Sequence, residues 1–179
     1  MIFVAVSAAI LPLSWRSLGA PRSHGFYRFF AFELILALIV WNAPVWFHDP
    51  FSARQILSWL LLISSIIPAL DGFRLLRSRG RPSREPATGA ELGFERTTAL
   101  VTTGIYRFIR HPMYASLLAV AWGAGLKRLT VATVALAAGA TAFLTATALA
   151  EERENLKRFG SGYQAYMRNT RRFIPFLFF

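Results

Sequence analysis

The sequence predicts an all-α integral membrane protein of about five transmembrane helices with a C-terminal cytoplasmic helix. Two observations carry this prediction. First, 55% of the 179 residues are hydrophobic and the mean hydropathy is +0.43, which is too apolar for a soluble domain of this size. Second, long apolar runs alternate with short basic segments along the whole chain. Such alternation is typical of helices that cross a bilayer.

Five apolar runs mark the predicted helices, at residues 2–15, 29–47, 56–76, 109–126 and 130–150. A helix needs about 20 residues to cross the hydrocarbon layer. The second, third and fifth runs are long enough on their own, whereas the first and fourth need flanking residues or a locally thinner bilayer. No basic segment precedes the first run. We therefore interpret it as a retained anchor rather than a cleaved signal peptide.

The charge distribution predicts the orientation. The net charge is +11, and of the 20 Lys and Arg residues only Arg54, Lys127 and Arg128 lie outside segments 16–28, 74–110 and 151–179. Basic residues are retained on the cytoplasmic side, so we expect an N-terminus outside and a C-terminus inside, in a bacterial inner membrane. A nucleic-acid partner would not explain the alternation with apolar spans. The expected partner is therefore the bilayer.

Four parts are expected along the chain. Three N-terminal spans occupy residues 1–76, and a Pro- and Gly-rich cytoplasmic loop occupies 77–105. A transmembrane hairpin follows at 106–150, and a cytoplasmic helix and tail complete the chain at 151–179. Small residues in the hairpin recur at helical spacing, which favours close packing of its two helices. They are Ala115, Ala119 and Gly123 in the first helix, and Ala135, Gly139, Ala142, Ala146 and Ala150 in the second.

The two ends of this hairpin carry complementary polar groups. Pro112 suits a first helical turn and directs His111 away from the helix axis. Arg110 offers donors for a carboxylate, while Glu151 and Glu152 could accept from an ammonium or from hydroxyl groups. An antiparallel hairpin would bring these groups to one level and create a site for a zwitterionic, amino-acid-like ligand. The chain has no cysteine, and no metal site is predicted.

Each of these residues also has a structural explanation when taken singly. Arg107 and Arg110 could be positive-inside anchors, and His111 could simply end a helix. The carboxylates of Glu151 and Glu152 could favour the N-terminal dipole of a following helix. The joint occurrence of these groups at the spacing of a packed hairpin favours a binding site.

Two segments resemble the signatures of a known family. Residues 103–114 read Thr-Gly-Ile-Tyr-Arg-Phe-Ile-Arg-His-Pro-Met-Tyr, and residues 151–166 read Glu-Glu-Arg-Glu-Asn-Leu-Lys-Arg-Phe-Gly-Ser-Gly-Tyr-Gln-Ala-Tyr. A closing Arg-Phe-Ile-Pro follows at 172–175. Together they resemble the isoprenylcysteine carboxyl methyltransferases and their phospholipid-methyltransferase relatives. The resemblance covers residues 97–175.

The resemblance implies an integral membrane methyltransferase that uses S-adenosylmethionine and releases S-adenosylhomocysteine. Carried over by position, one wall of the cofactor pocket would be Gly104, Tyr106, Arg110, His111, Pro112 and Tyr114. Glu151 and Glu152 would supply carboxylates, and the C-terminal wall would be Phe159, Gly160, Tyr163 and Tyr166. The family commonly has glycine where this chain has Ser116, which affects the expected pocket shape.

Methyl transfer would use Arg110, Glu151 and Glu152 as the catalytic set, with a lipophilic carboxylate or lipid-like acceptor. Two acids in the apolar runs, Glu33 and Asp71, are candidates for the substrate side or for a structural hydrogen bond. Two alternatives remain at this stage. One is a membrane reductase of the steroid-reductase type that uses NADPH, and the other is a non-enzymatic membrane accessory protein.

Overall fold

The computed structural model describes residues 2–21, 23–80 and 97–175, and these residues form helices and no β-strand. The predicted all-α class is therefore confirmed. Most of the predicted 77–105 loop lies outside the described residues. The helices are α1 (Ile2–Leu18), α2 (His24–Asn42), α3 (Ala53–Ser64), α4 (Ile66–Arg79), α5 (Pro112–Gly125) and α6 (Val131–Asn169), with 3-10 helices η1 (Ala43–Val45) and η2 (Gly104–Arg107).

Three helical segments of the described chain are long and apolar enough to cross a membrane: His24–Val45, Ala53–Arg79 and Val131–Asn169. These coincide, to within two residues at an end, with the three runs that the sequence predicted to span unaided, or extend beyond them. The other two helices, α1 with 17 residues and α5 with 14, are shorter than the roughly 20 residues that a span requires. The prediction of five spans therefore stays a prediction, while the membrane character of the fold is established.

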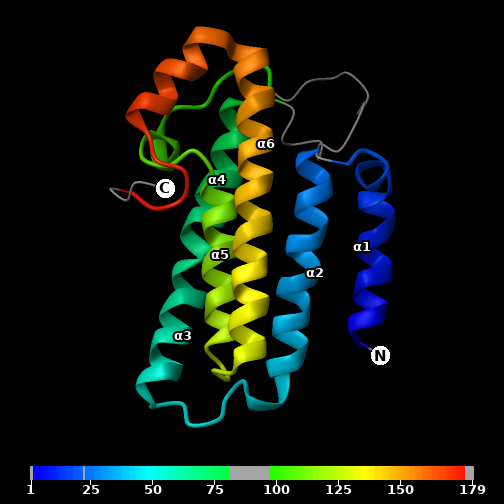
Figure 1. The fold of residues 1–179 in the computed structure, drawn as a ribbon. Helices are drawn as coiled ribbons and strands as arrows, with labels where there is room; N and C mark the ends of the chain where they lie inside the picture. The colour runs from blue at the N-terminus through cyan, green and yellow to red at the C-terminus, as the bar shows by residue number, and fades with distance from the viewer. Residues whose placement is uncertain (1, 22, 81–96, 176–179) are drawn as a thin grey trace.

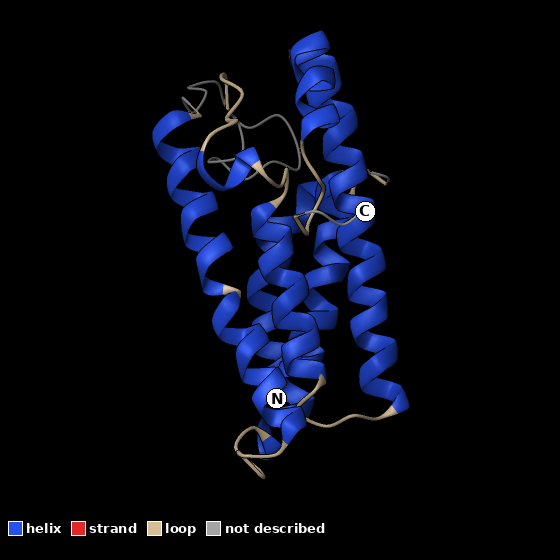
Figure 2. Cartoon of the chain, turned by 90° about the vertical axis from the view of Figure 1, so that its left-hand side faces the viewer, coloured by secondary structure: helices blue, strands red, loops and turns tan. Residues whose placement is uncertain are grey.

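The helices form an elongated bundle in which α6 is the central element (Figure 1). Helix α2 packs along α6, while α3 and α4 pack in succession along α5. Helix α1 packs against α2 at one side of the bundle, and the perpendicular view shows the same helical architecture (Figure 2). The core between α2, α5 and α6 consists largely of small and branched apolar side chains, including Ala31, Leu38, Ala121, Ala124, Ala137, Ala140 and Leu144.

Local sequence signals explain where the helices begin. The hydroxyls of Ser23 and Ser52 accept backbone N–H groups at the starts of α2 and α3, and Thr130 forms a capping box with Thr133 at the start of α6. Pro112 opens α5, where its missing N–H costs no hydrogen bond. These signals explain the first residues of α2, α3, α5 and α6.

The hairpin of α5 and α6 forms as predicted, but the two glycines proposed for its seam face other helices. A Cβ at Gly123 would lie 2.9 Å from Leu62 Cγ, so this glycine faces α3. A Cβ at Gly139 would lie 3.1 Å from Leu34 Cδ1, so that glycine faces α2. Both stripes were real packing signals, but each α5 or α6 helix has more than one neighbour, and spacing alone does not identify which one.

At the end of the bundle where the α5–α6 turn lies, polar side chains link α5 to α2 and α3. Lys127 is 1% exposed; its Nζ donates to Gln55 Oε1 at 2.9 Å and lies 3.6 Å from the centroid of the Trp59 ring. Ser58 Oγ donates to the carbonyl of Gly123 at 2.6 Å. The amide of Asn42 donates to the carbonyl of Ala124 at 3.0 Å. These contacts fix α5 against α2 and α3 at the end opposite the predicted site.

Helix α6 continues past the predicted boundary at residue 150 and bends only at Gly160. This glycine has φ 54° and ψ −131°, a backbone conformation that is costly for any residue with a Cβ. The bend turns the last helical segment across the end of the bundle (Figure 1). As a result, residues 161–175 return to the start of α5.

Substituting Gly123 tests the close contact between α3 and α5. In Gly123→Ala the new Cβ would lie 2.9 Å from Leu62 Cγ and 3.2 Å from the backbone oxygen of Ser58. We expect a loss of about 1–3 kcal/mol of unfolding free energy, measured by unfolding of the detergent-solubilised protein. The matched control is Gly162→Ala, whose Cβ would meet nothing within 4 Å. Equal stability of the two variants would contradict this packing.

Candidate active site

The entry to α5 is shaped by a tight turn beside α4. Gly104 has φ +60°, and a Cβ there would lie 2.5 Å from Leu75 Cδ1. Glycine therefore satisfies both the left-handed backbone and the close approach of α4. The turn begins η2, which places the Tyr106 side chain in the interior, with its hydroxyl 3.4 Å from the carbonyl of Gly72.

The segment before α5 pairs with the C-terminal segment that returns from the Gly160 bend. The N–H groups of Arg110 and His111 donate to the carbonyls of Arg171 and Arg172 at 2.8 and 3.1 Å. The N–H of Arg171 donates in turn to the carbonyl of Phe108 at 3.0 Å. We call residues 170–173 the C-terminal strap. Its backbone pairing brings the two sequence signatures into direct contact.

Glu152 lies at the centre of this junction. Its Oε1 accepts from Arg110 Nε at 2.9 Å and lies 3.3 Å from His111 Nε2. Arg172 donates hydrogen bonds to both oxygens, from Nε to Oε1 at 3.2 Å and from Nη2 to Oε2 at 2.9 Å. The carboxylate thus joins α6, the entry to α5 and the C-terminal strap.

The surroundings of Glu152 favour its ionised form. Burial acts to raise the pKa of this carboxyl, but hydrogen bonds from His111 and Arg172, with a further one from Arg110, lower the pKa far below its ordinary value of 4.5. Only 4% of the side chain is exposed. A buried charge is tolerated when it is paired and hydrogen-bonded, and Glu152 meets both conditions.

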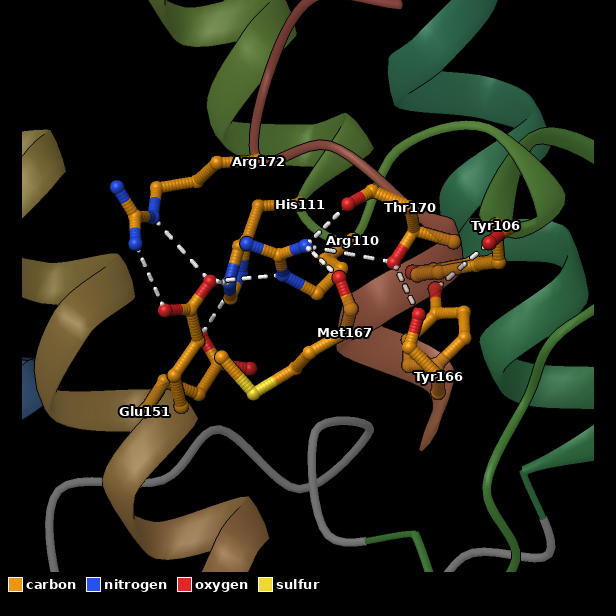
Figure 3. A network of polar contacts seen from close by, with 9 residues as sticks. Tyr106, Arg110, His111, Glu151, Tyr166, Met167, Thr170 and Arg172 are labelled. Carbon is orange, nitrogen blue, oxygen red and sulfur yellow. Dashed lines mark hydrogen bonds and ion pairs between the residues drawn. The ribbon is translucent and has the colours of Figure 1, made fainter. Parts of the chain in front are cut away.

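Arg110 also holds the C-terminal helix in place. Its Nη1 donates to the carbonyls of Met167 and Thr170 at 3.2 and 2.5 Å. Beside it, the Tyr166 hydroxyl donates to the carbonyl of Tyr106 at 2.7 Å (Figure 3). The arginine therefore satisfies the carbonyls that the end of a helix leaves unpaired. It ties the C-terminal wall to the carboxylate of Glu152.

A cavity lies beside this junction, with about 590 Å³ of empty space that includes its opening to solvent. Its wall combines aromatic, aliphatic and polar side chains from α4, α5, α6 and the segment between α4 and α5. This mixture is typical of sites for small organic ligands. The lining residues are Leu76, Thr97, Val101, Tyr106, Arg110, His111, Pro112, Met113, Tyr114, Glu151, Asn155, Phe159, Tyr163 and Tyr166.

The two neighbouring glutamates differ sharply in environment. Glu151 lines the cavity, and its buried Oε2 has no hydrogen-bond partner, although it lies 3.6 Å from His111 Nδ1. Glu152 lies behind the wall with its oxygens bonded to two arginines. Glu151 is thus the carboxylate on the cavity wall that has an unsatisfied oxygen.

The predicted site residues come together at one end of the bundle. Those that line the cavity include Tyr106, Arg110, His111, Pro112, Tyr114, Glu151, Phe159, Tyr163 and Tyr166. Gly104 and Gly160 shape the backbone on either side of it. The role of each residue toward a cofactor stays a prediction.

The two acids proposed for the substrate side lie in different places. Glu33 accepts a hydrogen bond of 2.6 Å from the hydroxyl of Ser7, which links α2 to α1. Asp71 lies beside η2, where its Oδ2 would be 3.6 Å from a Cβ at Gly104. Asp71 is therefore close to the entry of α5, whereas the contact that Glu33 makes is between helices.

Sequence reasoning missed several residues of this site, among them two polar residues close to the glutamates. Asn155 lines the cavity one helical turn after Glu151, and this i,i+4 spacing was a signal that could have revealed it. Arg172 grips Glu152 through both oxygens, but it lies 20 residues away along the chain. No local pattern predicts that pairing, because it depends on the bend at Gly160.

Two buried tyrosines on the cavity wall remain protonated. Burial raises the pKa of both Tyr163 and Tyr166 well above the ordinary value of 10.0. The negative charges of Glu152 and Glu151 raise the pKa of Tyr163 further. Each tyrosine thus presents a neutral hydroxyl at neutral pH rather than a phenolate.

Comparison with known proteins identifies the family. Residues 53–161, more than half of the chain, match the family model described as phospholipid methyltransferase. The chain belongs to this family. The match contains η2, α5 and α6 up to the Gly160 bend, and so includes both glutamates. Membership in a methyltransferase family favours this activity over the reductase and accessory-protein alternatives.

A curated relative gives a second finding. This phospholipid methyltransferase family member is 27% identical over 158 residues to methanethiol S-methyltransferase 2 of Bradyrhizobium diazoefficiens. The alignment covers 82% of this chain but only 57% of the relative, so the chain spans little more than half of the relative's length. No solved structure matches the chain.

Removing the charge of Glu152 tests the central junction. We expect Glu152→Gln to lose about 3–5 kcal/mol of stability, because Arg110 and Arg172 would be left buried without a counter-charge. The pKa of Glu152 is lowered on folding, so its contribution is present above the ordinary value of 4.5 and is lost as the pH falls below it. Unfolding midpoints measured from neutral pH down to about pH 3 should fall more steeply for the wild type than for Glu152→Gln.

The control for this experiment is Asp49→Asn. Asp49 is 65% exposed and has a φ of 48°, which asparagine tolerates. This variant should keep the wild-type pH profile. Parallel pH profiles for Glu152→Gln and the wild type would contradict the charged junction.

Proposed function

We propose that the protein is an S-adenosylmethionine-dependent methyltransferase that acts on a lipophilic acceptor, with the cofactor bound in the cavity at the α5–α6 junction. The observation that carries the proposal is the unsatisfied, buried Oε2 of Glu151 on the cavity wall. Buried polar atoms normally have a partner, so an orphaned carboxylate oxygen in a cavity suits a positively charged ligand group. The cofactor carries an ammonium group of this kind.

The remaining wall suits the other parts of such a cofactor. Asn155 and the neutral hydroxyl of Tyr163 are hydrogen-bonding groups suited to ribose. Tyr114 and Phe159 offer aromatic surface for a base. The guanidinium of Arg110 places positive charge beside the cavity, which suits a carboxylate, and His111 lies next to it. The side chains of the cavity wall therefore fit a zwitterionic ligand that contains a nucleoside.

When bound, S-adenosylmethionine supplies a methyl group that is already activated for transfer. The protein then has to hold the acceptor in line and exclude water, which aromatic and aliphatic walls can do. A carboxylate acceptor needs no base. A thiol or an amine must also lose a proton.

Arg110 and Glu152 have a different proposed role from Glu151. Glu152 is saturated by its cationic partners, and the Nε and Nη1 of Arg110 already donate to Glu152 and to backbone carbonyls. We therefore assign them to positioning the cavity wall. His111 contacts both carboxylates and lines the cavity. It therefore connects Glu152, which positions the wall, to Glu151, which we propose binds the cofactor.

The acceptor is proposed to be lipophilic and to reach the cavity from the bilayer. Asp71, beside η2, is the candidate for the substrate side, and Glu33 is the second. A small thiol is an alternative acceptor, because the named relative is a methanethiol S-methyltransferase. The basic segments further support a site facing the cytoplasm of a bacterial inner membrane.

Cofactor binding and methyl transfer test this proposal directly. The purified protein should bind S-adenosylmethionine but not NADPH, and should transfer a labelled methyl group to a component of a lipid extract or to a small thiol. In Glu151→Gln, binding should weaken by about tenfold or more, because a charge-assisted contact worth about 1.5–3 kcal/mol is lost. Calorimetry and mass analysis of the labelled product provide the measurements.

The matched control is again Asp49→Asn, which converts an exposed carboxylate far from the cavity into an amide. It should bind and react as the wild type does. If wild-type protein fails to bind S-adenosylmethionine, or if Glu151→Gln binds as tightly as the wild type, the proposed site is refuted.

A further inference from the structure

The first residue of α2 is a buried histidine. His24 is 4% exposed, and its Nδ1 lies 2.8 Å from Glu154 Oε2 on α6. The preceding Ser23 caps the helix through the N–H of Phe26, which fixes His24 in the first turn. The ion pair therefore joins the start of α2 to the part of α6 that extends beyond its apolar run.

This is an unfavourable place for a histidine without a partner. The N-terminal end of a helix carries partial positive charge, so a cationic side chain there gains nothing from the helix dipole. Burial adds a further cost for a polar ring. The partner on α6 offsets both costs. The contact is thus a specific connection between two helices.

Glu154 is rigidly linked to the cavity wall. Helix α6 is continuous up to the bend at Gly160, so Glu151, Glu154 and Asn155 lie on one helix. With 3.6 residues per turn, Glu154 lies only about 60° around the helix from Glu151. Any rotation of this turn that breaks the contact with His24 also moves Glu151 and Asn155 relative to the cavity.

We propose that His24 is a positioning residue for the cofactor site: by holding Glu154 it sets the direction in which Glu151 and Asn155 face the cavity. This inference rests on the proposed function and extends the site to α2. Residues 53–161 match the family model, so His24 lies outside the matched part. The family match therefore includes Glu154 but not its partner on α2.

Other charged groups face His24 and are part of the arrangement. The negative charges of Glu151 and Glu154 on α6 favour a positive charge on the His24 ring. The positive charge of Arg28, one turn later on α2, opposes it. Arg28 is itself buried. Glu151 is thus influenced by His24 in two ways, through the helix that it shares with Glu154 and through direct charge interaction.

The test is a double-mutant cycle on cofactor affinity. We expect His24→Gln and Glu154→Gln each to weaken S-adenosylmethionine binding by about threefold to tenfold, and the double variant to bind no more weakly than either single variant. The KM for the cofactor should rise while kcat changes little, because the contact positions the binding groups and does not touch the acceptor.

The chain offers a matched control pair at the opposite end. His48 Nδ1 lies 2.8 Å from Asp49 Oδ2, the same separation as in the buried pair, but both side chains are about two-thirds exposed, at 68% and 65%. His48→Gln, Asp49→Asn and their double variant should bind the cofactor as the wild type does. A purely general effect of removing an ion pair would appear in both cycles.

The outcomes separate this inference from the proposed function. Wild-type affinity in His24→Gln and Glu154→Gln, or effects that simply add in the double variant, would overturn the positioning role and leave the methyltransferase proposal intact. Loss of cofactor binding in the wild type would end both. If His24→Gln fails to fold, Glu154→Gln decides alone, since the Glu154 side chain is 42% exposed and its substitution leaves little buried space.

Discussion

The ion-paired carboxylate of Glu152 is the constraint on which the site depends. A charge this deeply buried is stable only when cations surround it, and here the cations come from the entry to α5 and from the C-terminal strap. Arg110 and Arg172 can both reach it only if α6 bends and the chain returns. Satisfying one carboxylate therefore brings three distant segments together, and the cavity wall is the surface that they form.

Two adjacent glutamates consequently acquire different roles. Neighbouring residues on a helix point about 100° apart, so Glu152 faces the cationic junction while Glu151 faces the cavity. The first stabilises the assembly, and the second keeps an oxygen available. His111 contacts both carboxylates, at 3.3 Å from Glu152 and 3.6 Å from Glu151. The Glu152 junction and the cavity-lining Glu151 are therefore connected through a single imidazole ring.

Much of the fold and part of the site followed from local patterns. Apolar length predicted the helices because lipid leaves the backbone no alternative partner, and Pro112 with the caps located their starts. The antiparallel hairpin placed His111 near Glu151. The packing partners of Gly123 and Gly139 were assigned wrongly, since a helix in a bundle has several neighbours. Arg172 was missed because nothing local links it to Glu152.

The sequence by itself determined the all-α membrane architecture and the end of the bundle at which the polar groups gather. Both follow from hydrophobic length and from the order of the residues along the chain. Only the tertiary structure decided which glutamate is saturated, that the strap supplies Arg172, and that His24 reaches α6. These contacts depend on the bend at Gly160 and on the rotation of each helix about its axis, which long-range packing sets.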